Sequence, residues 1–280
     1  MKHFLFIALI IGSIACSSSG NDPDPDDTDP GEEPGTSALG KGQPGVVGLS
    51  GISAWDNLSS SEKNKIKGWN AIFMHQSVGG DLEDGSANNG FRFEYFDMNE
   101  KPNGLSGNVF SASNGNPIEK IQEFKNNALA HKSAVQIAIF KFGYADINDG
   151  NLEQVKTAYK NMIDDLRSQI SGVRFVHVTP PLITIVTKDE GNAAKMKMAQ
   201  WMKDNFKDKD VIFELEEIES NNGACKLGSV WTLCSENRST SSCPSKNQGV
   251  DAPEGQGHLC EAAATRISKA FLMSIYNAGK

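Results

Sequence analysis

The feature that most constrains this chain is the alternation of short apolar runs with longer segments of helical period between residues 70 and 276. Four runs have the length and apolar content of buried strands: residues 70–75, 134–142, 173–178 and 211–215. Four segments repeat apolar side chains at helical spacing: residues 116–130, 152–170, 193–206 and 259–276. This pattern predicts an α/β fold with a central, mainly parallel sheet covered by helices on both faces, a three-layer α/β/α sandwich.

The loop after the first predicted strand carries the strongest chemical signal. Ligands of such sheets gather at the carboxyl ends of the strands, and there the chain places Ser77, followed closely by Gly79 and Gly80. A serine hydroxyl attacks a carbonyl only with a base to take its proton and donors to hold the oxyanion. Glycines allow backbone N–H groups to come close to that oxyanion. The alternative is an ordinary Ser/Gly turn; no Gly-Lys-Ser/Thr follows, as a phosphate loop would require.

Two more strand ends extend this pattern. The segment from Lys141 to Asp146 follows the second predicted strand, and His258 lies at the start of the final predicted helix. A serine after the first strand, a Gly-x-x-Asp block after a middle strand and a late histidine occur in the order typical of SGNH (GDSL-like) hydrolases. The chain resembles this superfamily from about residue 69 to 276, in the variant with a histidine, here His75, two places before the serine. The resemblance implies an SGNH/flavodoxin-like sheet.

Residue by residue, the resemblance implies that Ser77 is the nucleophile and that His258 is the general base. The oxyanion donors would be the N–H of Ser77, that of Gly79 or Gly80, and that of Gly115 in a loosely matching second block. We expect four further side chains to line the substrate pocket: His75, Asn114, Tyr144 and Asp146.

The chain departs from the family pattern at two positions. Ala145 stands where the family has an asparagine whose amide binds the oxyanion, so Asn114, Asn116 or another group must replace that donor. Gly255 stands where an aspartate usually orients the histidine. We expect Glu254 to take this role in preference to Asp251, or else a Ser-His dyad held by a backbone carbonyl.

These assignments predict a serine esterase that works through an acyl-enzyme and needs no metal or cofactor. The resemblance points to carbohydrate as the substrate class, with polysaccharide O-acetyl groups as the esters to be cleaved. The alternative is a catalytically inactive carbohydrate-binding or scaffold protein on the same fold, motivated by Ala145 and Gly255.

The N-terminus reads as an export signal. Lys2 precedes an apolar run at residues 4–11, and small residues lead to Cys16. The run is too short to span a bilayer, and Cys16 resembles the acylated cysteine of a bacterial lipoprotein. We therefore expect a signal peptide at residues 1–15, an acidic, Pro-rich tether at 16–48 and the folded domain at 49–280. The protein would be anchored by lipid in the cell envelope, at the outer membrane or cell surface.

The charge of the chain indicates which partners it can bind, and its cysteine content indicates how it is cross-linked. The formal net charge is −8, but seven acidic side chains lie between residues 22 and 33 and the remainder is close to neutral. Without a basic excess the chain is not expected to bind nucleic acid, and we expect a monomer. Four cysteines remain after Cys16, at spacings that predict two disulfides and no zinc site: Cys225, Cys234, Cys243 and Cys260. Three pairings are possible.

Overall fold

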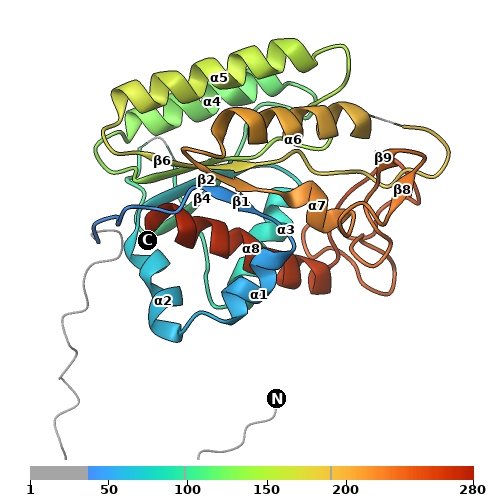
Figure 1. Cartoon of the computed structure of the whole chain (residues 1–280), viewed down its shortest axis with the longest axis horizontal. Coiled ribbons are helices and arrows are strands. Elements are labelled where there is room, and N and C mark those ends of the chain that lie inside the picture. Colours follow the sequence, from blue (N-terminus) through green and yellow to red (C-terminus); the bar gives the residue numbers. More distant parts are fainter. Residues whose placement is uncertain (1–36, 98, 190) are drawn as a thin grey trace, which may run out of the picture. The chain divides into compact units, whose positions relative to one another are not determined.

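A seven-stranded, all-parallel sheet forms the centre of the described chain, which in this computed structural model comprises residues 37–280 except Met98 and Glu190 (Figure 1). Its strands are β1 (Gly45–Val47), β2 (Ala71–His75), β3 (Glu94–Tyr95), β4 (Leu105–Val109), β5 (Ile137–Phe140), β6 (Arg174–Val178) and β7 (Val211–Phe213). Their order across the sheet is β1-β7-β6-β5-β2-β4-β3. A separate antiparallel hairpin pairs β8 (Lys226–Leu227) with β9 (Val230–Trp231).

Helices cover both faces of this sheet. They are α1 (Ser50–Asp56), α2 (Ser60–Asn64), the 3₁₀ helix η1 (Lys65–Gly68), α3 (Val78–Asn88), α4 (Pro117–Ala130), α5 (Leu152–Gln169), α6 (Asn192–Phe206), α7 (Leu215–Glu219) and α8 (Glu261–Gly279). In Figure 1, α4, α5 and α6 lie on one face, and α1, α3 and α8 lie on the other. The predicted three-layer α/β/α sandwich is thus confirmed.

The strands divide the core into two layers because successive side chains point to opposite faces. Phe73 and Ile139 belong to the cluster that contains the buried side chains of α8. Their neighbours Met74 and Phe140 belong to the cluster under α4, α5 and α6. Strands buried on both sides read as continuous apolar runs, which is why β2, β5, β6 and β7 are visible in the sequence.

Three strands of the sheet, β1, β3 and β4, were not predicted, and β1 changes a predicted boundary. β4 reads Leu105-Ser-Gly-Asn-Val109, which lacks an apolar run. β1 pairs with β7 and buries Val47, although it lies inside the segment 16–48 that was predicted as tether. The folded body therefore begins before residue 49. The signal segment, Cys16 and most of the predicted tether lie outside the described residues.

Residues just before β1 also belong to the folded body. The N–H of Gly40 donates to the carbonyl of Gly279 at 2.7 Å, and the N–H of Gln43 donates to that of Asn277 at 2.7 Å. These bonds pair the incoming chain with the carbonyl groups that end α8, which a helix leaves without intrahelical partners.

The position of β2 determines where a ligand can bind. From β2 the chain crosses to β3 and β4 on one side and then returns to β5 on the other. Such a reversal opens a crevice at the carboxyl ends of the strands, because the loops leave on opposite faces of the sheet. The segment after β2, beginning at Gln76, lies at this point.

The assignment of β1 to the sheet is tested by two neighbouring substitutions. Val47 is 6% exposed and Val46 is 41% exposed. Val47→Asp buries a carboxylate without a partner and should lower the free energy of unfolding by about 3 kcal/mol or more. Val46→Asp should change it by less than about 0.5 kcal/mol. Urea denaturation measures both. Equal and small effects of the two substitutions would indicate that residues 45–48 belong to the tether and not to the sheet.

Candidate active site

Ser77 occupies a strained turn between β2 and α3. Its backbone has φ 57° and ψ −117°, and it is one of three residues other than glycine with positive φ among the described residues. Such a conformation is costly for a side chain with a Cβ atom and persists where the surrounding structure enforces it. The strand ends at His75 and the helix begins at Val78, so the turn leaves the half-buried Ser77 hydroxyl at the carboxyl edge of the sheet.

The structure brings Ser77 together with His258, which lies 181 positions later in the chain. Ser77 Oγ is 2.7 Å from His258 Nε2. His258 Nδ1 is 2.6 Å from Asp251 Oδ1, and the other carboxylate oxygen of Asp251 accepts the His258 backbone N–H at 2.8 Å. A carboxylate can only accept, so Nδ1 carries the proton and Nε2 is left to accept from the serine hydroxyl. This is the geometry of a Ser-His-Asp triad.

The preference for Glu254 as the acid that orients His258 is wrong. Its side chain is partly exposed, and its carboxylate accepts the N–H groups of Val186 and Thr187, each at 2.7 Å; these bonds lower the pKa of Glu254. The reason is the path of the loop. Gly255 has φ +82° and its N–H donates to the carbonyl of Thr184, which directs Glu254 toward residues 186–187 and leaves Asp251 beneath the imidazole.

A buried carboxylate fixes the backbone directly after His258. Asp81 of α3 accepts the N–H of Leu259 at 3.0 Å and the hydroxyl of Ser245 at 2.6 Å. Its carboxylate is 2% exposed, and burial raises its pKa. Asp81 is not among the site residues predicted from the sequence. No sequence signal marks Asp81, because its role depends on the packing of α8 against α3.

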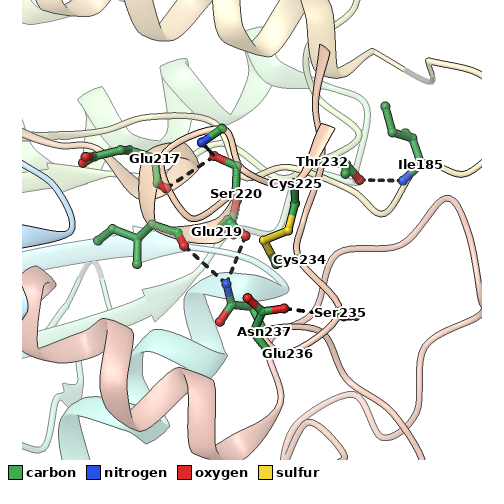
Figure 2. Close-up of a disulfide and its surroundings, with 12 residues drawn as sticks. Ile185, Glu217, Glu219, Ser220, Cys225, Thr232, Cys234, Ser235, Glu236 and Asn237 are labelled. Atoms are coloured by element: carbon green, nitrogen blue, oxygen red, sulfur yellow. Dashed lines mark hydrogen bonds between the residues drawn. A yellow bond between two sulfur atoms is a disulfide. The ribbon is translucent and has the colours of Figure 1, made fainter. Parts of the chain in front are cut away.

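The two disulfides hold the loops around this histidine. Cys243 is bonded to Cys260, which precedes the first residue of α8, and Cys225 is bonded to Cys234. Figure 2 shows the second disulfide beside Asn237, whose amide donates to the carbonyl groups of Ile218 and Glu219. Both predicted disulfides are present, and they place the folded domain outside the cytoplasm. Glu236 lies near Cys225 and Cys234, but these sulfurs are bonded to each other and offer no thiolate to a metal.

Three glycines predicted to hold an oxyanion do not have a free N–H. Gly79 donates to the carbonyl of Gln76 at 3.1 Å, and Gly80 donates to that of Ser77 at 2.8 Å. Gly115 donates to Asp146 Oδ1 at 2.8 Å. Gly79 is required for a different reason, since a Cβ at this position would lie 2.3 Å from the Cβ of His75.

Other donors remain at the same edge of the sheet. Within residues 37–280, no described group accepts the N–H of Ser77 or that of Val78, the residues at the start of α3. Helix N-termini present such N–H groups to anions, so these two fit an oxyanion better than the glycines do.

Asn114 offers a further amide. Its Oδ1 accepts from Lys120 Nζ at 3.2 Å. An ammonium group only donates, so the oxygen must face Lys120 and the NH₂ group must face away. No described residue accepts from Asn114 Nδ2, and Asn114 is exposed. Among the residues that the structure describes, none forms a hydrogen bond that would orient the Asn116 side chain.

Asp146 does not line the pocket as predicted. It is fully buried, and its two oxygens lie 2.8 Å from Lys120 Nζ. The same carboxylate accepts the N–H groups of Gly115 and Gly143. Asp146 therefore joins the loop after β4 to the loop after β5, and these bonds leave no room for a substrate. Lys120, its buried partner, has no motif around it in the sequence.

His75 is also misplaced by the sequence prediction. The ring is 2% exposed and lies under the first turn of α3, where its Nε2 is 3.0 Å from Glu83 Oε1. His75 is the last residue of β2, and its side chain follows Phe73 onto the α3 and α8 face. It supports the helix instead of contacting a ligand.

Tyr144 does lie beside the triad. Its ring meets that of His258 edge to face, with centroids 5.5 Å apart. Burial raises the pKa of the Tyr144 hydroxyl, and the nearby Asp251 carboxylate adds to this. A half-buried aromatic ring at this position can form one wall of a substrate cleft.

An amine and a carboxyl group that can carry opposite charges are buried below the site. Lys141 and Glu219 are both 0% exposed. Burial lowers the pKa of Lys141 to about 8 and raises that of Glu219 to about 8. Glu219 Oε2 accepts the N–H of Leu182 at 2.6 Å, which fixes the loop after β6 to α7.

Comparison with known proteins does not assign the chain to a family. No protein-family model matches it, and no curated protein is significantly similar to it. Among the described residues, every helix is too short or too polar to cross a membrane.

The raised pKa of Glu219 predicts how stability depends on pH. The stability that this group contributes is present below its unfolded pKa, near 4.5, and is lost as the pH rises through about 8. Glu219→Gln stays neutral and should avoid this loss. Between pH 5 and pH 8.5 the variant should therefore gain on the order of 3 kcal/mol relative to the wild type.

Urea denaturation of both proteins at the two pH values, with disulfides intact, measures the difference. Glu236→Gln, on the exposed surface, serves as the control and should track the wild type at both values. A Glu219→Gln variant that also tracks the wild type would show that Glu219 ionises normally in the folded protein.

Proposed function

We propose that this protein is a serine hydrolase of the SGNH type that cleaves carboxylic esters through an acyl-enzyme. The observation that carries the proposal is the connected series Ser77 Oγ, His258 and Asp251, with contacts of 2.7 Å and 2.6 Å at the carboxyl edge of the sheet. A serine without a catalytic role would not require a buried histidine–aspartate pair in hydrogen-bond contact with its hydroxyl.

The proposed reaction begins when Ser77 Oγ attacks the ester carbonyl and His258 Nε2 takes its proton. Asp251 then stabilises the imidazolium without accepting a proton. The tetrahedral intermediate collapses when His258 returns the proton to the alcohol as it leaves. Water attacks the acyl-enzyme with His258 again as the base, which releases the acid and restores Ser77.

The oxyanion would be held by the N–H groups of Ser77 and Val78 and by the Asn114 side-chain amide. This set answers the departure at Ala145, because Asn114 supplies an amide where the family residue is missing. The departure at Gly255 no longer argues against catalysis either, because Asp251 forms the hydrogen bond to the His258 imidazole. Both reasons for the inactive alternative are thereby weakened.

The alcohol part of the substrate is proposed to be carbohydrate, with acetyl as the acyl group. Support comes from the surface beside the site. The Gln76 amide holds the loop after β4 by donating to the carbonyl groups of Phe110 and Ala112, each at 2.8 Å. Beyond this loop lies an open depression of about 470 Å³ with hydrogen-bonding side chains that include Ser111, Ser113 and Gln122. Such a surface suits a hydroxyl-rich chain better than a lipid.

The location proposed for this activity is the outside of the cell, consistent with the two disulfides. We propose that Cys16 is acylated and holds the domain at the cell envelope through the acidic segment that follows. This part of the proposal rests on the sequence, since Cys16 lies outside the described residues.

A fluorophosphonate probe tests the function directly. The probe phosphonylates activated serines, so the wild-type protein should be labelled and should release acetate from an acetylated polysaccharide. Ser77→Ala should abolish both, because no other group in the triad can form the acyl-enzyme. Absence of labelling in the folded wild-type protein would favour the inactive binding protein.

The choice between the two acids is tested by a matched pair of substitutions. In Asp251→Asn the amide oxygen can keep the His258 backbone N–H while its NH₂ group donates to Nδ1, so the imidazole takes the wrong tautomer and kcat for 4-nitrophenyl acetate should fall by about 10³-fold or more. Glu254→Gln alters only the exposed bonds to residues 186–187 and should change kcat by less than about threefold. Loss of activity in Glu254→Gln with retention in Asp251→Asn would reverse the assignment.

A further inference from the structure

We propose that Lys141 is a positioning residue that holds the Gln76–Ser77 peptide from inside the protein, so that the Ser77 N–H faces the oxyanion. The inference rests on the proposed function and adds a residue to its machinery. Lys141 is fully buried, and among the described residues its ammonium donates to backbone carbonyl groups and not to the Ser77 hydroxyl or the imidazole.

The sheet explains how Lys141 reaches this peptide. It directly follows β5, and its N–H continues the pairing with β2 by donating to the carbonyl of Met74 at 3.1 Å. Side chains alternate along the strand, so Lys141 points to the same face as Ile139, the face covered by α3 and α8. It therefore lies below the turn in which β2 ends and α3 begins.

The ammonium contacts two backbone carbonyl groups. Lys141 Nζ donates to the oxygen of Phe142 at 2.9 Å and, through a longer bond, to that of Gln76 at 3.4 Å. The Gln76 oxygen also accepts the N–H of Gly79 at 3.1 Å. The carbonyl of Gln76 is thus fixed toward the interior by two donors.

The geometry of the peptide bond converts this contact into a constraint on the site. In a planar trans peptide, the C=O and the N–H point in opposite directions. Because the Gln76 carbonyl faces Lys141, the Ser77 N–H must face away from it, toward the carboxyl edge of the sheet. No described group accepts this N–H. A positive charge on the carbonyl side also polarises the peptide and makes its N–H a stronger donor.

The charge of Lys141 is costly, and its surroundings only partly offset it. The charged groups that act on it are Glu219 from α7, Asp81 from α3, Asp146 from its own loop and Lys120 from α4; the three acids stabilise the ammonium and Lys120 opposes it. A well-packed apolar side chain is often as stable as, or more stable than, a buried charge. Retention of an ammonium here is explained if the ammonium acts on the turn that carries Ser77.

The closing experiment compares two buried lysines. Lys141→Met should lower kcat for 4-nitrophenyl acetate by roughly 10- to 100-fold with little change in KM, and it should slow fluorophosphonate labelling to a similar extent. Its melting temperature should stay at or above that of the wild type, because the substitution removes a buried charge. Lys195→Met provides the control: Lys195 is also 0% exposed but bonds to Asn192 Oδ1. Its kcat should be unchanged per folded protein.

A pH profile separates positioning from packing. The wild-type kcat should fall on the alkaline side with a midpoint near pH 8, as the ammonium loses its proton. This decline should be absent from Lys141→Met. Glu219 titrates in the same range, so Glu219→Gln is needed as well. It should keep the decline and move it to lower pH, because the carboxylate that favours the charged lysine has been removed.

Nuclear magnetic resonance provides a readout that needs no activity and no variant. The amide resonance of Ser77 in the wild type should shift with a midpoint near pH 8, since its peptide carbonyl loses a charged donor there. A Ser77 resonance unaffected by pH, or a Lys141→Met variant with wild-type kcat, would overturn the inference and leave the proposed function standing. A wild-type protein that neither reacts with fluorophosphonate nor hydrolyses the ester would overturn both.

Discussion

The carboxylate of Asp81 joins the two parts of the chain that make up the site. It lies on α3, the helix that begins immediately after Ser77, and it accepts the N–H of Leu259, the residue after His258. This buried contact spans 178 positions in the sequence. Packing of α8 against α3 brings the two segments close, and Asp81 then sets their register. The distance between the serine and the imidazole depends on this bond.

Buried acidic side chains hold backbone groups around the site in a consistent way. Asp81 accepts from Leu259, Glu219 from Leu182, and Asp146 from Gly115 and Gly143. Each of these carboxyl groups fixes the backbone of a loop that follows a strand or precedes a helix. Satisfied polar networks of low exposure are stiff, because breaking one bond leaves a buried group unpaired. The loops can therefore keep donors and acceptors in place without regular secondary structure.

The sequence predicted the layers of the fold and the serine and histidine of the site, because both depend on patterns that can be read directly from the order of residues. Continuous apolar runs located β2, β5 and β6, and loop order located Ser77 and His258. It failed where the outcome depends on the path of a loop: Asp251 instead of Glu254 meets the imidazole, and the N–H groups of Gly79, Gly80 and Gly115 are already bonded. Lys141 and Asp81 went unrecognised because burial of a charge is visible only in three dimensions.

The most direct measurement is a crystal structure of the protein after reaction with a fluorophosphonate. The account predicts phosphorus bonded to Ser77 Oγ, with the phosphoryl oxygen within hydrogen-bonding distance of the Ser77 and Val78 N–H groups and of Asn114 Nδ2, and with His258 still paired to Asp251. An adduct on another residue, or a phosphoryl oxygen that points away from all three donors, would contradict it.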